Sequence, residues 1–97
     1  MIIDCLTLWT SNLMWDGCSD ADIATRAAAA ARCAAGRDVV AVSNEVGSGI
    51  HPDTDLGRRY RDTLGRVNQA WVGASSQALL VVAGRALDLR DPWDVLA

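Results

Sequence analysis

The sequence contains no lysine, so all nine of its basic residues are arginines. A chain without lysine has no phosphate-binding loop of the G-x-x-x-x-G-K-[ST] type, no Schiff-base lysine and no lysine general base. Its formal net charge of -3 and pI of about 4.8 also differ from the basic balance that most nucleic-acid-binding domains carry. We therefore expect no nucleic-acid partner and no lysine-dependent chemistry within these 97 residues.

Cysteine and histidine are also scarce. Cys5, Cys18 and Cys33 form no C-x-x-C pair, and there is one histidine. An odd number of scattered thiols argues against a disulfide framework and a zinc site, and favours buried, reduced cysteines. The N-terminus lacks the charge and apolar pattern of a signal peptide, and the longest uncharged stretch, residues 5–15, is too short to span a bilayer. These features predict a cytoplasmic protein without a membrane span.

Apolar, β-branched runs alternate with helical patterns along the chain. The runs at residues 1–3, 39–42 and 78–83 are typical of strands buried in a parallel sheet, and residues 87–89 suit a short edge strand. Strands alternating with helices imply parallel pairing and right-handed crossovers. The order β-α-α-β-α-β therefore predicts an α/β fold with a mostly parallel sheet and flanking helices.

Three helices are expected between these strands. The first has apolar residues at helical spacing over residues 6–13 and ends at Asp16-Gly17. The second is rich in alanine, with Ser19 as its cap and Gly36 just beyond its end. The third carries an apolar stripe over residues 56–71 and starts at Asp53 or Thr54.

Two details of the third helix lead to finer expectations. Its polar face pairs aspartates with arginines four residues on, at Asp55–Arg59 and Asp62–Arg66. Such pairing indicates a solvated face rather than a phosphate-binding one. A glycine in the helix interior costs about 1 kcal/mol relative to alanine, so Gly65 predicts that another element packs closely there.

Polar residues follow each predicted strand, where open parallel sheets bind ligands. Asp4 ends the first strand, residues 43–45 end the second and residues 84–85 end the third. Asp4 suits a magnesium ion or its water beside a nucleotide phosphate, or equally an N-cap of the next helix. Asn44 and Glu45 suit substrate hydroxyls or a metal, or the satisfaction of backbone groups in the loop.

The loop after residue 44 gives weaker signals. Gly47-x-Gly49 does not continue into G-x-G-x-x-G, because Pro52 stands at the required position. His51 has no nearby carboxylate partner, which indicates an exposed loop histidine rather than a general base. The four tryptophans lie among apolar residues, so core or subunit-interface packing is expected of them.

Four ordered segments resemble the adenosylcobinamide kinase / adenosylcobinamide-phosphate guanylyltransferase family. They are D-C-L-T-L-W with S-N-L at residues 4–13, V-S-N-E-V-G-x-G-I-x-P at residues 42–52, R-x-R-D with G-R-V-N-Q at residues 59–69, and L-V-V-A-G at residues 80–84. The likeness covers about residues 1–89. The second string and G-R-x-N-Q are long enough to be fairly specific.

The resemblance implies a bifunctional transferase of cobalamin synthesis. Such enzymes phosphorylate adenosylcobinamide with a nucleoside triphosphate, then transfer GMP from GTP through a guanylated histidine to give adenosylcobinamide-GDP. It implies a P-loop-type fold, a trimer, Mg²⁺ with GTP or ATP, and no tightly bound cofactor. In that family the residue matching Asp4 lies by the nucleotide.

The family's phosphate loop and nucleophilic histidine lie in an N-terminal half without counterpart here. His51 stands where the family commonly has an apolar residue, so no catalytic residue is expected in this chain. Residues 1–97 are thus interpreted as the C-terminal portion of such a domain, inactive alone. The alternative is a non-catalytic remnant, or a complementing subunit that needs a partner bearing the phosphate loop.

Overall fold

The computed structural model describes residues 1–44 and 54–96. The elements that it describes, in chain order, are β1 (Ile2–Asp4), α1 (Leu6–Trp15), α2 (Asp20–Ala34), β2 (Val40–Val42), α3 (Asp55–Ala74), β3 (Leu79–Val82), β4 (Arg85–Asp88) and α4 (Pro92–Leu96). The first six follow the predicted order β-α-α-β-α-β, which confirms the α/β class. None of the described helices is long and apolar enough to cross a membrane.

The helix ends follow from local side-chain chemistry. The Ser19 hydroxyl accepts a hydrogen bond from the Asp22 amide at 3.1 Å, and the Thr54 hydroxyl accepts one from the Gly57 amide at 2.9 Å. Each bond satisfies one free amide of a helix start. Thr54 is therefore the cap of α3, while Asp53, the other predicted cap, lies outside the described residues. Gly36 follows α2 with a positive φ of 78°, as a residue beyond a helix end often does.

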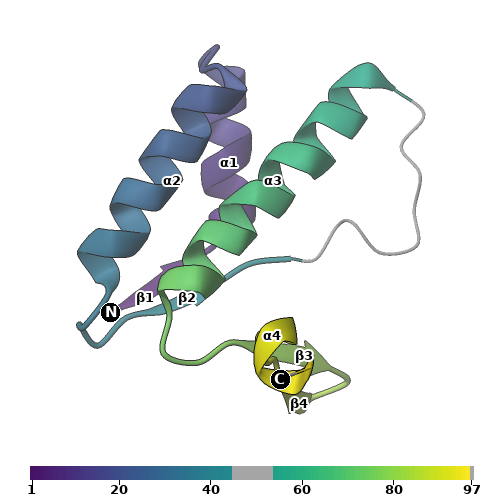
Figure 1. The fold of residues 1–97 in the computed structure, drawn as a ribbon. Coiled ribbons are helices and arrows are strands. Elements are labelled where there is room, and N and C mark those ends of the chain that lie inside the picture. The colour runs from purple at the N-terminus through teal and green to yellow at the C-terminus, as the bar shows by residue number, and fades with distance from the viewer. Residues whose placement is uncertain (45–53, 97) are drawn as a thin grey trace.

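The three long helices gather on one side of the β1–β2 pair (Figure 1). Their contacts bury Leu6 of α1, Ile23 and Ala27 of α2, and Leu64 and Val67 of α3. Ala31 is also buried, so the alanine-rich segment serves packing, as predicted. Small side chains let α2 approach α3 closely, and the pair forms the largest helix contact of the described chain.

The strands β1 and β2 run parallel, with Ile3 opposite Ala41. These two residues are partly buried against the helical core. The alternate residues face away from the helices, so Ile2, Val40 and Val42 are 73%, 61% and 43% exposed. The predicted burial of β1 and β2 is therefore confirmed only for the face that the helices cover.

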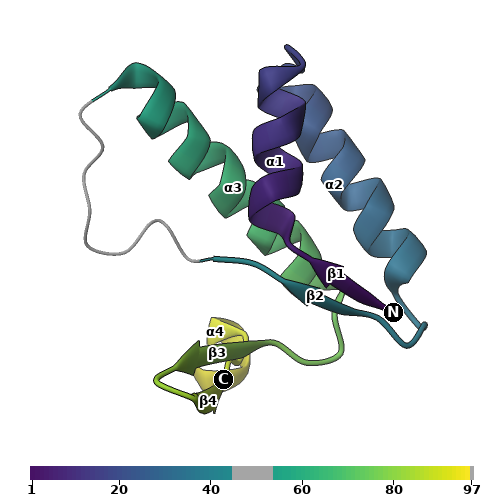
Figure 2. The ribbon, with the colours of Figure 1, turned by 180° about the vertical axis from the view of Figure 1, so that it is seen from behind.

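The prediction of a third buried parallel strand over residues 78–83 is wrong. Residues 79–82 pair with Arg85–Asp88 in a separate antiparallel sheet, and every residue of both strands is exposed. The cause is the two-residue turn at Ala83 and Gly84, whose φ angles of 51° and 72° are both positive. Positive φ at both central residues is the geometry of a tight hairpin turn, which sends the chain straight back. Figure 2 shows this hairpin and α4 apart from the helices.

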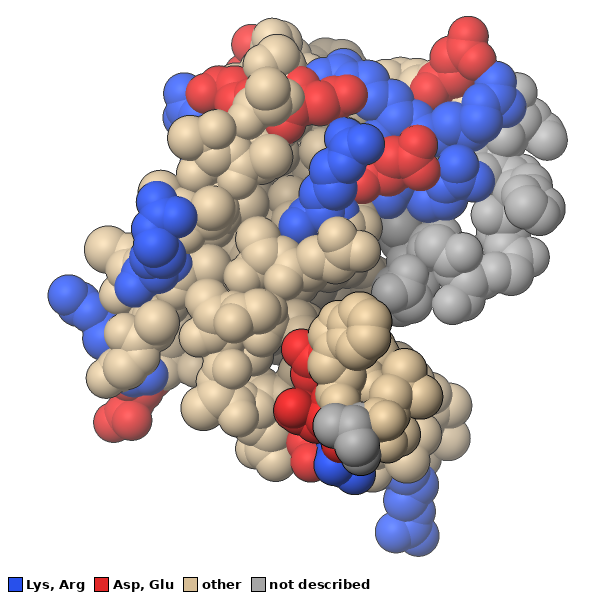
Figure 3. Space-filling view, in the orientation of Figure 1, with Lys and Arg blue, Asp and Glu red and all other residues tan. Residues whose placement is uncertain are grey.

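The polar face of α3 also differs from the predicted pairing. Asp55 pairs with Arg58, and Asp62 pairs with Arg61 at 3.1 Å. Arg59 instead crosses to α2 and binds Asp20 at 2.6 Å. Figure 3 shows acidic and basic side chains interleaved where α2 and α3 begin, which agrees with the expected solvated, charge-paired surface.

Gly65 and the three cysteines complete the comparison with the sequence. A Cβ atom added at Gly65 would meet nothing within 4 Å, so the expected close packing at this glycine is wrong within the described chain. All three cysteines are free thiols, as predicted. Cys5 and Cys18 are half-buried, but Cys33 is exposed rather than buried.

Candidate functional site

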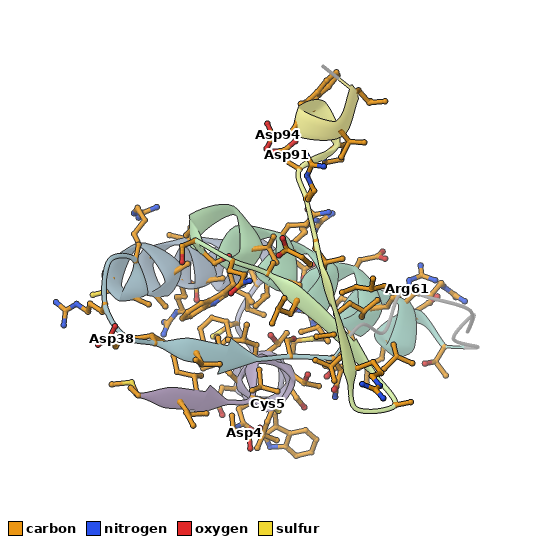
Figure 4. The ribbon with its side chains drawn as sticks, turned by 90° about the horizontal axis from the view of Figure 1, so that it is seen from below. Asp4, Cys5, Asp38, Arg61, Asp91 and Asp94 are labelled. Carbon is orange, nitrogen blue, oxygen red and sulfur yellow. The ribbon has the colours of Figure 1, made fainter. Side chains whose placement is uncertain are left out.

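The carboxyl ends of β1 and β2 meet at one edge of the parallel pair. Asp4, the last residue of β1, lies opposite Val42, the last residue of β2, so Ser43 and Asn44 leave the sheet beside it. Asp4 lies at this end of the pair in Figure 4, and Asp38 lies at the other. Two of the three polar groups predicted to share an edge are thus together.

The third group lies elsewhere. Gly84 and Arg85 belong to the turn and first residue of the β3–β4 hairpin, not to the end of a parallel strand. The prediction that they share the edge with Asp4 is therefore wrong. The tight turn that makes the hairpin is also what removes them from this edge.

Asp4 has an exposed carboxylate on the face of the sheet that the helices leave uncovered. It does not cap the following helix, because Cys5 occupies the N-cap position of α1 and no side chain bonds there. The Asp4 carboxylate makes no hydrogen bond or ion pair with the residues that the structure describes. The capping alternative thus finds no support.

Ser43 and Asn44 are held from two sides. The Ser43 hydroxyl donates to Oδ1 of Asn68 at 2.5 Å, and Nδ2 of Asn68 donates to the Asn44 carbonyl at 3.0 Å. From the other side, the Asn44 amide donates to the Thr7 hydroxyl at 3.1 Å. Both backbone hydrogen-bonding groups of Asn44 are therefore satisfied by side chains, one on α1 and one on α3.

Tyr60 connects α3 to the first turn of α1. Its hydroxyl donates to the Thr7 carbonyl at 3.3 Å. Burial raises the pKa of Tyr60 above its ordinary value of 10.0, and the nearby Cys5 thiol adds to the rise. Tyr60 therefore stays protonated at neutral pH and keeps its hydrogen for this bond.

Sequence reasoning missed Thr7, Tyr60 and Asn68 as parts of this edge. Tyr60 belongs to the apolar stripe predicted over residues 56–71, which accounts for its ring but not for its hydroxyl. Asn68 stands next to Val67 of that stripe, and eight residues after Tyr60, so both lie on the helix side that meets the sheet edge. A polar residue beside a buried stripe is the signal that could have identified Asn68.

Glu45 and His51 lie outside the described residues. Among the residues that are described, no three His, Cys, Asp or Glu side chains gather as a metal cage would require. A lone carboxylate such as Asp4 still fits Mg²⁺, because that ion keeps several waters and takes one or two carboxylates together with substrate phosphates.

These features define an α/β protein with a polar site at the carboxyl edge of two parallel strands. The sequence model of one family, cobinamide kinase / cobinamide phosphate guanyltransferase, matches residues 1–89. The chain belongs to this family.

Three curated relatives agree with the match. The chain is 35% identical over 106 residues to the bifunctional adenosylcobalamin biosynthesis proteins CobU of Escherichia coli and of Salmonella typhimurium, covering 93% of this chain and 58% of each relative. It is 35% identical over 94 residues to the bifunctional adenosylcobalamin biosynthesis protein CobP of Pseudomonas aeruginosa, covering 93% of this chain and 53% of that protein. The chain thus spans little more than half the length of these relatives.

Proposed function

We propose that the chain is the C-terminal portion of a bifunctional transferase of cobalamin synthesis. The whole enzyme would phosphorylate adenosylcobinamide with GTP or ATP and then transfer GMP from GTP to give adenosylcobinamide-GDP. The family match over residues 1–89 carries this proposal. The shared edge of Asp4 and Asn44 supports it, because ligands of open parallel sheets bind outside the carboxyl ends of the strands.

Within this site, Asp4 would face the nucleotide and contact its magnesium ion through a bound water. That ion would arrive with the triphosphate and neutralise the charge on the phosphates. Asn44, and Glu45 after it, would contact nucleotide or cobinamide. The assignment to Asp4 is supported by its exposed carboxylate, which neither caps α1 nor pairs with a described residue.

The remaining machinery would come from outside these 97 residues. Phosphoryl and nucleotidyl transfer depend on groups that stabilise developing phosphate charge, and this chain has no lysine to form a phosphate loop. The nucleophilic histidine would likewise lie in the family's N-terminal half. We therefore expect the intact enzyme, as a homotrimer, to hold both halves of the site.

An activity assay tests the proposal. The chain is incubated with adenosylcobinamide, GTP and Mg²⁺, alone and with a polypeptide that supplies the phosphate loop and histidine of the family. We expect no turnover alone and turnover on mixing, reduced at least about tenfold by Asp4→Asn and unchanged by Asp38→Asn at the opposite end of the sheet. Full turnover by the chain alone would contradict the division of the site.

A second candidate function is a non-catalytic remnant or a complementing subunit that folds onto a partner. The exposed apolar strands favour it, since Ile2 and Val40 on one sheet and Val81 and Leu87 on the other are each more than 60% exposed. Exposed patches of this kind mark interaction surfaces. Size-exclusion chromatography and circular dichroism of the chain alone separate the possibilities: a monomer with a cooperative melt would count against dependence on a partner.

A further inference from the structure

The two residues that follow β2, Ser43 and Asn44, are tied to two helices beside the candidate site. Ser43 and Asn44 together make three hydrogen bonds to the side chains of Thr7 and Asn68, at 2.5, 3.0 and 3.1 Å. The two partners come from α1 and α3, 61 positions apart in the sequence by their numbers. Local chain geometry alone therefore does not fix this segment, and the two helices do.

Each partner matches its group in a way that few side chains could. Asn68 accepts from the Ser43 hydroxyl with its carbonyl oxygen and donates to the Asn44 carbonyl with its amide nitrogen. A side-chain amide carries its acceptor and its donor on two separate atoms of one terminus, whereas a hydroxyl has a single oxygen for both roles. Aspartate would keep the acceptor and lose the donor, and alanine would lose both.

Thr7 and Asn68 together form a clamp on Ser43 and Asn44, and Thr7 is also hydrogen-bonded to Tyr60 of α3. Its hydroxyl accepts from the Asn44 amide, while its backbone carbonyl accepts from the Tyr60 hydroxyl. Thr7 also lies three residues after Asp4, in the first turn of α1. The first turn of α1 therefore contacts Asn44 and closely follows Asp4, the proposed nucleotide contact, in the chain.

We propose that Asn68 and Thr7 are positioning residues, which hold the Ser43–Asn44 backbone beside Asp4 so that a nucleotide meets both strand ends in one arrangement. Neither residue needs to touch the ligand for this role. Tyr60 supports the arrangement by holding the first turn of α1 against α3. The inference rests on the proposed nucleotide site at this edge and names two residues on which its geometry depends.

The test mixes the isotope-labelled chain with the polypeptide that supplies the family's phosphate loop and histidine, titrates the mixture with Mg²⁺·GTP and follows the amide NMR signals of Asp4 and Asn44. The variants are Asn68→Ala, Asn68→Asp, Thr7→Val and Thr7→Ser. Gln77→Ala and Thr25→Val are matched controls, since both residues are exposed and lie away from this edge. Melting temperatures are recorded for all of them.

We expect Asn68→Ala and Thr7→Val to weaken nucleotide binding about tenfold, the scale of one or two lost hydrogen bonds. Thr7→Ser keeps the hydroxyl and should bind like the wild type, and Asn68→Asp should fall between Asn68→Ala and the wild type. If Asn68→Ala or Thr7→Val unfolds, the nucleotide affinities of Thr7→Ser and Asn68→Asp are compared instead. Weaker binding by Asn68→Asp than by Thr7→Ser supports the positioning role, and equal binding overturns it.

Two negative outcomes are distinguishable. If the wild type binds and all four variants bind as tightly, the positioning role is overturned while the nucleotide site stands. If the wild-type signals of Asp4 and Asn44 do not respond, the nucleotide site itself is contradicted, and the positioning role falls with it. Equal weakening by the two controls would also overturn the inference, because the effect would then not be specific to the clamp.

Discussion

Apolar residues are buried in one region of the molecule and exposed in another. The first region is the helical body, residues 1–44 and 54–74, and the second is the hairpin segment, residues 79–96. Leu64 and Val67 of α3 are fully buried, whereas Val81, Val82 and Leu87 of the hairpin are more than 60% exposed. A lone two-stranded hairpin is marginally stable in water. The apolar sequence of β3 therefore fits a contact that the described residues do not supply, while the body has a core of its own.

The largest expected difference between the two regions is the cost of truncating an apolar side chain. Leu64→Ala removes a fully buried side chain and should lower the free energy of unfolding by about 2–5 kcal/mol. Val81→Ala, in the exposed hairpin, should change it by less than about 0.5 kcal/mol. Chemical denaturation followed by circular dichroism measures both. Equal costs would show that the hairpin is packed against the body in solution.

A smaller effect is expected at the start of α3. Thr54→Ala removes the hydroxyl that accepts from the Gly57 amide and should cost about 1 kcal/mol. Thr25→Ala is the matched control, because the Thr25 hydroxyl donates to a carbonyl inside α2 rather than capping a helix. The two denaturation midpoints give the comparison. A cost at Thr54 no greater than that at Thr25 would argue against the cap.

The ionic link between α2 and α3 should contribute less still. Arg59 binds Asp20 and also donates to the Cys18 carbonyl at 2.9 Å, but the two charged side chains are 36% and 42% exposed. Solvent screening therefore limits the expected cost of Arg59→Ala to below about 1 kcal/mol. Arg26→Ala, which removes an exposed pair within α2, should cost less. Salt should reduce the difference, and a difference that persisted in high salt would point to packing instead.

The smallest expected effect is a change of stability with pH, and it involves the helical body alone. Tyr60 is the single tyrosine of the chain, and its pKa is raised above 10.0. Because the folded state favours the protonated phenol, its contribution to stability is complete below pH 10 and is lost as the pH rises through the raised pKa. Ultraviolet absorbance of tyrosinate should show this late titration, and Tyr60→Phe should flatten stability in that range. A titration at the ordinary value would contradict burial of the phenol.

The body was the more predictable region because its signals are local. The caps at Ser19 and Thr54, the turn at Asp16-Gly17 and the alanine-rich helix each follow from residues a few positions apart. The edge position of Asp4 and Asn44 also followed, since it needs only the parallel pairing of two short strands.

The sequence did not predict the hairpin, because an apolar run does not indicate which element will pack against it. Residues 79–82 have the composition of a buried parallel strand, yet the positive φ angles at Ala83 and Gly84 return the chain to pair with β4. Likewise, no spacing rule could pair Arg59 with Asp20 instead of Asp55, because that choice depends on how α2 packs on α3. The Thr7–Asn44–Asn68 bonds depend in the same way on how α1 and α3 pack beside the end of β2.

The central claim is that the nucleotide meets the body at the carboxyl edge of β1 and β2, and not at the hairpin. A map of amide NMR shifts tests it most directly, recorded on adding Mg²⁺·GTP to the wild-type chain mixed with the polypeptide that supplies the phosphate loop. We expect shifts of the amide signals of Asp4, Thr7 and Asn44, and no shifts at Val81 and Leu87. Shifts confined to the hairpin, or none at the strand ends, would contradict it.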